Sequence, residues 1–281
     1  MATIVTLASH VARGHVGNSV TVFALQRLGH EVWHLPTVML PYHPGHGPGH
    51  RIVTPADQIE HLLADLADNA PLDQVSAVLT GYLGSADQAA PIAGFIEKVK
   101  ARAPNPLYVC DPVLGDGDAL YVDEGIARAI RDHLVPIADV ITPNLFELGW
   151  LTGKTLTDGS DTRDAARGLS VKNAFVTSAP ALMRNHTGMM AVTDTLAMMA
   201  EAPTTAHPPH GLGDLSAALV LSHMLKGEDV TTILRRTLAS VHDLAIQTDR
   251  RRLKEIPLAA EQHRLLQSAI AVQIRTLAEI K

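Results

Sequence analysis

The sequence predicts an α/β fold of three layers, in which helices cover both faces of a mostly parallel sheet. Three observations lead to this prediction. Short apolar runs rich in β-branched residues recur along the chain, beginning with residues 3–8. Segments with the apolar spacing of a helix separate these runs, as at residues 55–69. Polar loops that contain glycine follow several of the expected strands, and such loops bind ligands in open α/β sheets.

Length and composition narrow the class of protein. The chain has 281 residues, 46% of them hydrophobic, and we expect a single domain over residues 1–281. The net charge of −6 argues against a nucleic-acid partner. The single cysteine, Cys110, argues against disulfides and indicates a reducing compartment such as the cytoplasm. No apolar run is long enough to span a bilayer, so no membrane partner is expected.

In the first half of the chain, apolar runs predict strands at residues 3–8, 31–35, 77–80 and 107–110. Helical spacing predicts helices at residues 19–28, 55–69 and 86–103. Residues 37–50 are rich in proline, glycine and histidine, and we expect them to form a loop over a site.

In the second half, strands are expected at residues 138–141 and 173–178, and a β-rich stretch at residues 187–201 that turns at residues 193–195. Helices are expected at residues 123–133, from Pro143, from near Gly213, and at residues 230–247 and 258–280. Proline suits the first turn of a helix, because its missing N–H group would have no partner there.

The segment HGLGDLSAALVL, at residues 210–221, predicts a loop that leads into a buried helix. Its glycines let backbone N–H groups turn inward, and the first N–H groups of a helix bind anions. The backbone of Gly211, Leu212 and Gly213 is therefore a candidate cradle for a phosphate. Asp214 is placed to accept a proton from an attacking hydroxyl group, although the motif taken alone favours a helix cap.

Three acidic or amide side chains follow two other expected strands. Asp111 comes directly after residues 107–110, where it is placed for a metal or a phosphate. Asn144 and Glu147 are three residues apart and share one face at a strand-to-helix junction. Glu147 is well placed to hold Mg²⁺ through water, because that ion keeps several waters and binds few carboxylates. A helix-capping pair is the alternative for Asn144 and Glu147.

Several segments together resemble the ribokinase superfamily, and within it the pyridoxal kinases. They are residues 9–19 and 25–29, Gly-Tyr-Leu-Gly-Ser at 81–85, residues 116–122, Asn-x-x-Glu at 144–147 and Gly-x-Gly-Asp at 211–214. The resemblance covers residues 3–248. It implies a ribokinase-like fold and the ATP-dependent phosphorylation of the 5′-hydroxymethyl group of pyridoxal, pyridoxamine or pyridoxine, a step that salvages vitamin B6 as pyridoxal 5′-phosphate. Mg²⁺, a K⁺ ion and a homodimer are also implied.

The resemblance assigns roles to individual residues. The base is Asp214, and the anion hole that stabilises the transferring phosphoryl group is formed by Gly211, Leu212 and Gly213. The residues implied to bind the vitamer are Ser9, His43, Tyr82, Tyr121 and Asp214. Those implied to bind ATP are Asp111, Asn144, Glu147, Thr177, Ser178 and Leu212, with Asp111 and Glu147 organising Mg²⁺. Residues 116–122 resemble a flap that closes over both ligands, with Gly117 as its hinge.

The chain departs from the pattern of these kinases at three positions. Leu212 replaces the usual threonine between the two glycines, but it supplies the same backbone N–H group. A His-Thr-Gly-Tyr segment of the pyridoxal kinases is matched by His43 and Gly45, whereas Pro44 and His46 differ from it.

Two other functions stay open. One is a hydroxymethylpyrimidine kinase of the same superfamily, although residues 14–18 do not match the Ser-Gly-Gly-Ala-Gly loop that is usual in those enzymes. The other is a non-catalytic vitamin B6-binding protein that has kept the fold. The presence of both Asp214 and Glu147 argues against a non-catalytic protein.

Overall fold

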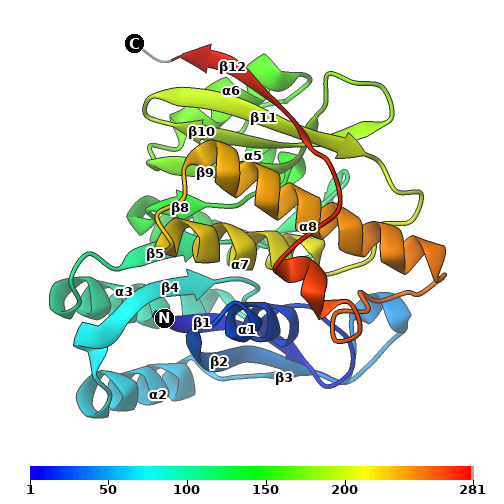
Figure 1. The fold of residues 1–281 in the computed structure, drawn as a ribbon. Coiled ribbons are helices and arrows are strands. Elements are labelled where there is room, and N and C mark those ends of the chain that lie inside the picture. Colours follow the sequence, from blue (N-terminus) through cyan, green and yellow to red (C-terminus); the bar gives the residue numbers. More distant parts are fainter. Residues whose placement is uncertain (280–281) are drawn as a thin grey trace.

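A single ten-stranded sheet runs through the computed structural model, which describes residues 1–279 (Figure 1). The order of its strands is β12-β11-β10-β9-β8-β5-β4-β1-β2-β3. Their bounds are β1 (Thr3–Val11), β2 (Glu31–Leu40), β3 (Ile52–Val53), β4 (Val75–Thr80), β5 (Leu107–Cys110), β8 (Val140–Ile141), β9 (Asn173–Pro180), β10 (His186–Thr193), β11 (Leu196–Pro203) and β12 (Gln273–Glu279). A separate hairpin is formed by β6 (Gly115–Asp116) and β7 (Ala119–Leu120).

The centre of the sheet is parallel, as the sequence predicts. Strands β2, β1, β4, β5, β8 and β9 pair in parallel, and antiparallel strands extend the sheet at both ends. Almost every residue of β1 is buried, because helices cover both faces of the sheet. The carboxyl ends of the parallel strands therefore meet at one edge of the sheet.

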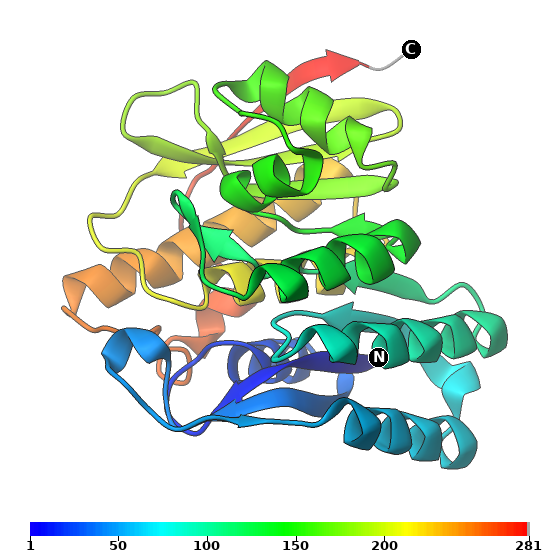
Figure 2. The ribbon, with the colours of Figure 1, turned by 180° about the vertical axis from the view of Figure 1, so that it is seen from behind.

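Two layers of helices complete the predicted three-layer fold. One face is covered by α1 (Asn18–Arg27), α7 (Leu212–Leu225) and α8 (Val230–Arg250), which stand in front of the sheet in Figure 1. The other face, turned to the viewer in Figure 2, is covered by α2 (Ala56–Asn69), α3 (Ala89–Arg102), α4 (Glu124–Ala129), α5 (Leu145–Thr152) and α6 (Gly159–Gly168). Each layer encloses its own buried apolar cluster.

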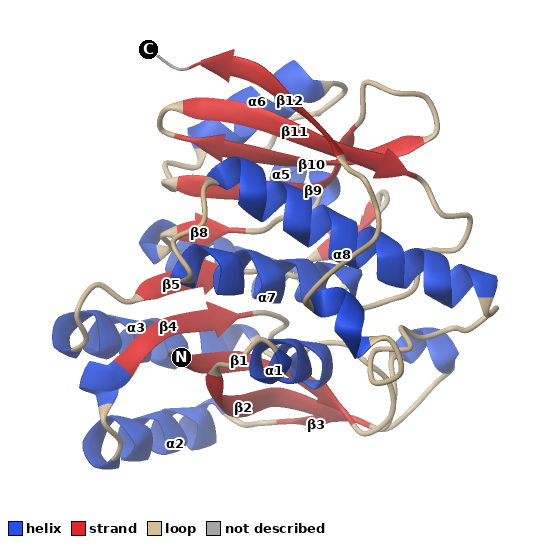
Figure 3. Cartoon of the chain, viewed as in Figure 1, coloured by secondary structure: helices blue, strands red, loops and turns tan. Residues whose placement is uncertain are grey.

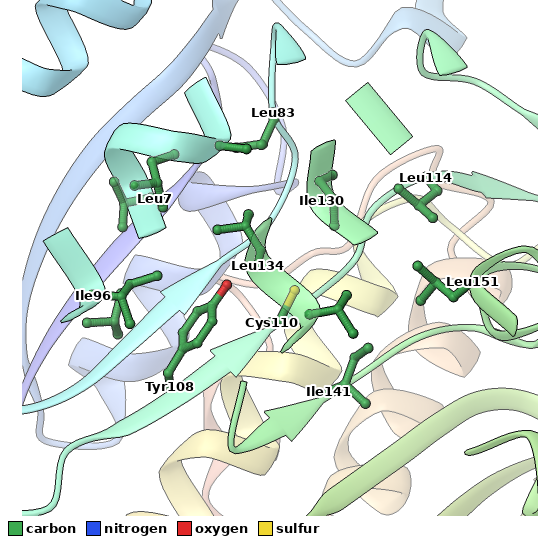
Figure 4. Close-up of a cluster of buried hydrophobic side chains, with 14 of the residues drawn as sticks. Leu7, Leu83, Ile96, Tyr108, Cys110, Leu114, Ile130, Leu134, Ile141 and Leu151 are labelled. Carbon is green, nitrogen blue, oxygen red and sulfur yellow. The ribbon is translucent and has the colours of Figure 1, made fainter. Parts of the chain in front are cut away.

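The core around the ends of β4 and β5 is apolar, except for one pair of hydroxyl groups that hydrogen-bond to each other. Figure 4 shows Tyr108 and Cys110 among leucine and isoleucine side chains from both the sheet and the helices. The Tyr108 hydroxyl is fully buried, and it lies 2.8 Å from the Thr80 hydroxyl, so burial leaves neither group without a partner. Such packing holds the ends of β4 and β5 in fixed positions.

The prediction of a helix at residues 258–280 is wrong. A short turn at Gln262–Leu265 and strand β12 occupy this part of the chain, and β12 pairs with β11 in antiparallel fashion. Val272 and Ile274, two residues apart, pack on one apolar cluster, whereas Leu277 packs on the other. That alternation is typical of a strand, and the partner edge lies far away in the sequence. Residue 280 lies outside the described residues.

The loop expected at residues 37–50 is shorter than predicted. Strand β2 continues to Leu40, so only residues 41–50 form a loop, with a 3₁₀ turn at Pro44–His46. Pro36 is tolerated inside the strand because β3 pairs only with Val38 and Met39, which leaves β2 an open edge beside the proline.

Among residues 1–279, no helix has the length and apolar character that crossing a membrane requires.

Candidate active site

The predicted site residues gather at the carboxyl edge of the parallel strands. Ser9 lies near the end of β1, Asp111 follows β5 directly, and Thr177 lies in β9 beside the end of β8. The start of α7 faces the same edge from the loop after β11. Figure 3 shows the long loops of the chain gathering at this edge, where α8 ends.

Helix α7 begins with a backbone conformation that requires glycine. Gly211 is its N-cap residue and has φ of 90°, in the left-handed region. A Cβ atom at this position would lie 2.1 Å from the carbonyl oxygen of His15. The first N–H groups after Gly211 have no acceptor within the helix, and they point out of its positive end. The expected start of a helix near Gly213 is confirmed.

Asp214 stands in the first turn of α7, beside these N–H groups. It is not the N-cap residue, since Gly211 occupies that position without a side chain. The backbone N–H group of Gly17 donates a hydrogen bond to the Asp214 carboxylate. Burial raises the pKa of Asp214 to about 6, against the opposing effect of hydrogen bonds from Gly17 and from its own backbone. At neutral pH the group is therefore ionised yet basic enough to accept a proton.

Gly17 links Asp214 to Ser9. Its φ is 54°, and a Cβ atom there would lie 2.3 Å from the Ser9 carbonyl oxygen and 2.4 Å from the Ser9 hydroxyl oxygen. Only glycine permits this approach. The structure therefore brings Ser9 and Asp214 to the two sides of one glycine.

Asp111, Glu147 and Asp214 form an acidic group. The pKa of Asp111 is raised by burial and then by the charges of Asp214 and Glu147. The Thr142 hydroxyl donates a hydrogen bond of 2.8 Å to Asp111 and acts in the opposite direction. Burial raises the pKa of Glu147 to about 8, although backbone N–H groups hold the carboxylate. Carboxylates in such surroundings favour a bound cation.

Asn144 and Glu147 form a capping box, which was the alternative for this pair. The Asn144 side chain accepts a hydrogen bond from the Glu147 backbone N–H group, and Glu147 Oε2 accepts one from the Asn144 N–H group, both at 2.8 Å. The other oxygen, Oε1, accepts from the Leu114 N–H group at 2.9 Å. The expected position of Pro143 in the first turn is wrong, because Asn144 caps the helix and Pro143 precedes it.

Asn144 also touches the hairpin and β9. Its amide nitrogen donates to the Gly115 carbonyl at 2.8 Å, and the Thr177 N–H group donates to the Pro143 carbonyl at 2.9 Å. Thr177 is therefore adjacent to Asn144. Ser178, the next residue, is exposed and has φ of 52°, in the left-handed region.

Tyr82 and Tyr121 line the same cavity of about 340 Å³, together with Arg51. The Tyr82 backbone carbonyl is held by a hydrogen bond of 2.6 Å from the Thr37 hydroxyl. The Tyr121 residue is 56% exposed, and the pKa of its hydroxyl is raised by desolvation and by the charges of Glu147 and Asp214. The two tyrosines predicted for one pocket thus lie in one pocket.

His43 lies outside the cavity of the two tyrosines. It caps the turn at Pro44–His46, accepting a hydrogen bond from the Gly45 N–H group at 3.0 Å. Its ring stacks on the ring of His210, with centroids 3.7 Å apart. Burial, then the neighbouring His210 and His46, lower the pKa of His43 to about 4, so the ring is neutral at pH 7.

Sequence reasoning gave no role to several residues that the structure brings to the site: Gly17, Arg51, His210 and Glu255. Gly17 belonged to a segment expected near ligands, so its glycine was an available signal, whereas Arg51 lies one residue beyond the loop expected at residues 37–50. His210 directly precedes the cradle. Glu255 is far from the site in sequence, and no local pattern points to it.

The role predicted for Glu147, to hold Mg²⁺ through water, implies that Glu147→Gln should raise the Mg²⁺ concentration for half-maximal rate roughly tenfold. The amide keeps one acceptor oxygen for the Asn144 or the Leu114 N–H group, so the variant should still fold. Titration of the initial rate with Mg²⁺ at saturating ATP measures the shift. A lower melting temperature with an unchanged titration would reduce Glu147 to a helix cap.

The sheet order and the glycine-led start of α7 define a class, the ribokinase-like kinases of small molecules. The pyridoxal kinase of Entamoeba histolytica has this fold with a TM-score of 0.90, at 21% identity over 98% of this chain and 99% of that one. A putative phosphomethylpyrimidine kinase from Bacteroides thetaiotaomicron, crystallised with pyridoxal, superposes with a TM-score of 0.88 at 25% identity, over 98% and 99% of the chains.

The sequence places the chain within this class. The family model described as phosphomethylpyrimidine kinase matches residues 51–253. Pyridoxal kinase PdxY of Corynebacterium diphtheriae is 33% identical over 98% of this chain and 99% of its own length, and that of Rubrobacter xylanophilus is 37% identical over 98% and 97%. The chain belongs to the phosphomethylpyrimidine kinase family and, within it, to the pyridoxal kinases.

Proposed function

We propose that this protein transfers the γ-phosphoryl group of ATP to the 5′-hydroxymethyl group of pyridoxal, pyridoxamine or pyridoxine, and so salvages vitamin B6 as pyridoxal 5′-phosphate. The observation that carries the proposal is Asp214, ionised and basic, in the first turn of a helix whose free N–H groups face the same edge of the sheet. Family membership supports the choice of substrate.

Asp214 acts as the general base in this proposal. The vitamer hydroxyl lies against the Asp214 carboxylate and transfers its proton to that carboxylate. At the same time the hydroxyl oxygen attacks the γ-phosphorus of ATP, and the bond between the γ-phosphorus and the β-phosphate oxygen breaks, which releases ADP. The hydrogen bond from Gly17 fixes the orientation of the carboxylate. Ser9, on the other side of Gly17, is positioned to bind the pyridine ring of the vitamer.

The backbone of Gly211, Leu212 and Gly213 forms the anion hole. Transferring phosphoryl groups spread negative charge over their oxygens, and N–H groups fixed in advance stabilise that charge without reorganisation. Because backbone groups do this work, Leu212 is compatible with activity. Asn144, Thr177 and the neighbouring Ser178 are proposed to place the ATP phosphates.

The acidic group fits Mg²⁺. Among residues 1–279, no three histidine, cysteine or carboxylate side chains converge as a metal cage, which agrees with an ion that keeps its waters and takes one or two carboxylates plus phosphate oxygens. Asp111 and Glu147 would hold it, and the raised pKa values of both support the proposal, because a bound cation would stabilise their ionised forms. When bound, Mg²⁺ neutralises charge on the ATP phosphates.

The cavity of Tyr82 and Tyr121 is proposed as part of the ring pocket. Its volume and aromatic walls suit a flat heteroaromatic ring. His43 is proposed to act from the loop of residues 41–50, through its stack on His210. A monovalent cation such as K⁺ and a homodimer complete the proposal. Because ATP is the phosphoryl donor, we place the reaction in the cytoplasm.

A hydroxymethylpyrimidine kinase is the second candidate. It is favoured by the description of the family model, which covers residues 51–253 and therefore leaves out the loop at residues 14–18. A vitamin B6-binding protein without catalysis is the third candidate. It would have no use for a basic carboxylate beside the anion hole.

The hairpin of β6 and β7 is proposed to close over the ligands. Gly117, at its tip, has φ of 64°, and Tyr121 follows the second strand. Closure would exclude water from the phosphoryl group.

Tyr121→Ala should weaken pyridoxal binding and raise the ratio of ATP hydrolysed to vitamer phosphorylated. Gly117→Val should slow turnover, because valine is strained at this φ.

Limited proteolysis tests this closure. The segment of residues 116–122 should be protected when ATP and pyridoxal are both bound. Equal cleavage with and without the ligands would make it an ordinary surface hairpin.

Product analysis tests the proposed function. The protein is incubated with Mg²⁺, ATP and each vitamer in turn, and mass spectrometry measures ADP and the phosphorylated vitamer. One ADP should form for each pyridoxal 5′-phosphate. Formation of ADP without a phosphorylated vitamer, or of neither product, would contradict the proposal.

A further inference from the structure

The loop of residues 41–50, here called the acceptor loop, packs through the ring of His43 on His210, which directly precedes the proposed anion hole. We infer that Glu255 is a positioning residue that holds this loop in place for binding of the vitamer. The inference rests on the proposed function for its substrate, and on the contacts of Glu255 for its mechanism. Glu255 itself follows α8 and touches none of the proposed reacting atoms.

The principal contact joins Glu255 to the acceptor loop. Its Oε1 atom lies 2.8 Å from His46 Nε2, and only 11% of the histidine side chain and 26% of the glutamate side chain are exposed. Arg13 Nε approaches the same oxygen at 3.9 Å from the loop after β1. A contact this sheltered is screened less by solvent than a surface ion pair.

Glu255 also packs on two other loops. A Cβ atom at Gly14 would lie 2.9 Å from the Glu255 carboxylate, so glycine is what allows the carboxylate to lie against this backbone. The backbone of Glu255 forms a β-bridge with His210, whose ring stacks on His43 of the acceptor loop. One glutamate therefore contacts the loop after β1, the acceptor loop and the loop that precedes α7.

The acceptor loop has few other attachments. The Pro41 carbonyl, at the start of the loop, accepts a hydrogen bond from the Arg13 N–H group. Past Pro41 its hydrogen bonds are internal, from His46 and Gly45 to His43, from Gly47 to Pro44 and from Tyr42 to Pro48. Within residues 1–279, no hydrogen bond joins residues 42–50 to another segment. Residues 42–50 are thus held to the rest of the protein by the His46 contact and by the stack of His43 on His210.

The segments around the anion hole also have backbone contacts that do not involve the Glu255 carboxylate. The loop after β1 is fixed by backbone hydrogen bonds from Ala12 to Leu40 and from Arg13 to Pro41, at 2.9 and 3.0 Å. The carbonyl of His15 then packs against Gly211. Removal of the Glu255 carboxylate should therefore loosen the acceptor loop and leave the phosphoryl-transfer machinery in place.

His46 is one of the positions at which this chain departs from the His-Thr-Gly-Tyr segment of pyridoxal kinases. In this chain His46 contacts Glu255, so the histidine that replaces tyrosine at this position has a structural role. The side chain ties the loop to the segment after α8, in place of whatever contact a tyrosine would make.

Steady-state kinetics and binding test the inference with Glu255→Ala and Glu255→Gln. Loss of a close, partly buried polar contact with a charged group is expected to cost about a factor of ten in an equilibrium constant. For Glu255→Ala we expect the KM and the Kd for pyridoxal to rise about tenfold, with kcat and the KM for ATP within about twofold of the wild type. Glu255→Gln keeps the shape and should fall between the two.

Trypsin supplies a readout that needs no substrate. Arg51 adjoins the acceptor loop and is exposed. Cleavage after Arg51 should become faster in Glu255→Ala, whereas Asp164→Asn, which breaks the exposed ion pair with Arg163, should leave cleavage and kinetics unchanged. His46→Ala should reproduce the effect from the other side of the contact, and the double variant should be no worse than Glu255→Ala alone.

The outcomes separate the inference from the proposed function. Unchanged pyridoxal Kd and unchanged cleavage in both Glu255→Ala and His46→Ala would overturn the inference, as would an equal loss in kcat and in the affinity for ATP, which indicates general disruption. If Glu255→Ala does not fold, His46→Ala decides alone. Wild-type protein that does not phosphorylate pyridoxal would contradict the proposed function, while faster cleavage after Arg51 would still support the role of Glu255.

Discussion

Asp214→Asn is expected to lower kcat by roughly 10²–10⁴ while leaving the affinity for ATP intact. The amide keeps the size of the side chain and its hydrogen bond from the Gly17 N–H group, but it cannot accept the proton of the attacking hydroxyl. Pre-steady-state and steady-state assays with pyridoxal measure the loss, and equilibrium binding measures the affinity for ATP. Near wild-type turnover would return Asp214 to a structural role at the start of α7.

The pH dependence gives the same carboxylate a second test. A base must be ionised, so the kcat/KM of the wild type should rise with pH through a midpoint near the Asp214 pKa of about 6 and level off above it. Below the midpoint the rate should fall about tenfold per pH unit. The residual activity of Asp214→Asn should lack this dependence.

Stability provides the control for Asp214→Asn. Because burial raises the pKa of the folded state, the protonated carboxyl stabilises the fold at low pH, and that contribution is lost as the pH rises through about 6. The variant should therefore melt no lower than the wild type above pH 6. A much lower melting temperature would mean that the loss of activity comes from unfolding.

Gly211→Ala is expected to lower kcat by roughly 10²–10³, the loss that follows removal of one donor from an anion hole. The added Cβ atom would lie 2.1 Å from the His15 carbonyl oxygen, and alanine is strained at φ of 90°. The start of α7 must therefore shift, and the N–H groups with it. Measurement of kcat at saturating ATP and pyridoxal checks the result.

Gly227→Ala is the matched control for Gly211→Ala. Gly227 lies just beyond the other end of α7 with φ of 70°, and a Cβ atom there meets nothing within 4 Å. It imposes similar backbone strain far from the anion hole, so it should lower the melting temperature without lowering kcat. If both variants lose activity equally, or if Gly211→Ala keeps its kcat, the start of α7 does not form the anion hole.

The fold was predictable where local pattern and tertiary structure agree. Central strands such as β1 are buried on both faces, so they appear as apolar runs, and helices such as α8 show a clear apolar stripe. Strand β12 was missed because its partner β11 lies some seventy residues earlier, and only that edge gives the strand its backbone hydrogen bonds. The end of β2 was missed because proline in a strand is tolerated only beside an open edge.

For the candidate site too, residues in local motifs could be predicted from the sequence, whereas contacts between distant loops could not. Asp111, at the end of the parallel strand β5, and Asp214, at the start of α7, come from motifs that the sequence already predicted to lie at the site, and the structure brings their charges within reach of each other. The sequence could not show that His43 would stack on His210, since this contact joins two loops that are far apart in the chain. The Glu255 contact with His46 was hidden for the same reason, and its residue types carry no motif.

Competition between two acceptors tests the central claim most directly. The protein is given ATP, Mg²⁺ and equal concentrations of pyridoxal and 4-amino-5-hydroxymethyl-2-methylpyrimidine, and the initial rates of the two phosphorylated products give the ratio of their kcat/KM values. We expect pyridoxal 5′-phosphate to form at least about tenfold faster. Faster phosphorylation of the pyrimidine, or phosphorylation of neither compound, would contradict the assignment as a pyridoxal kinase.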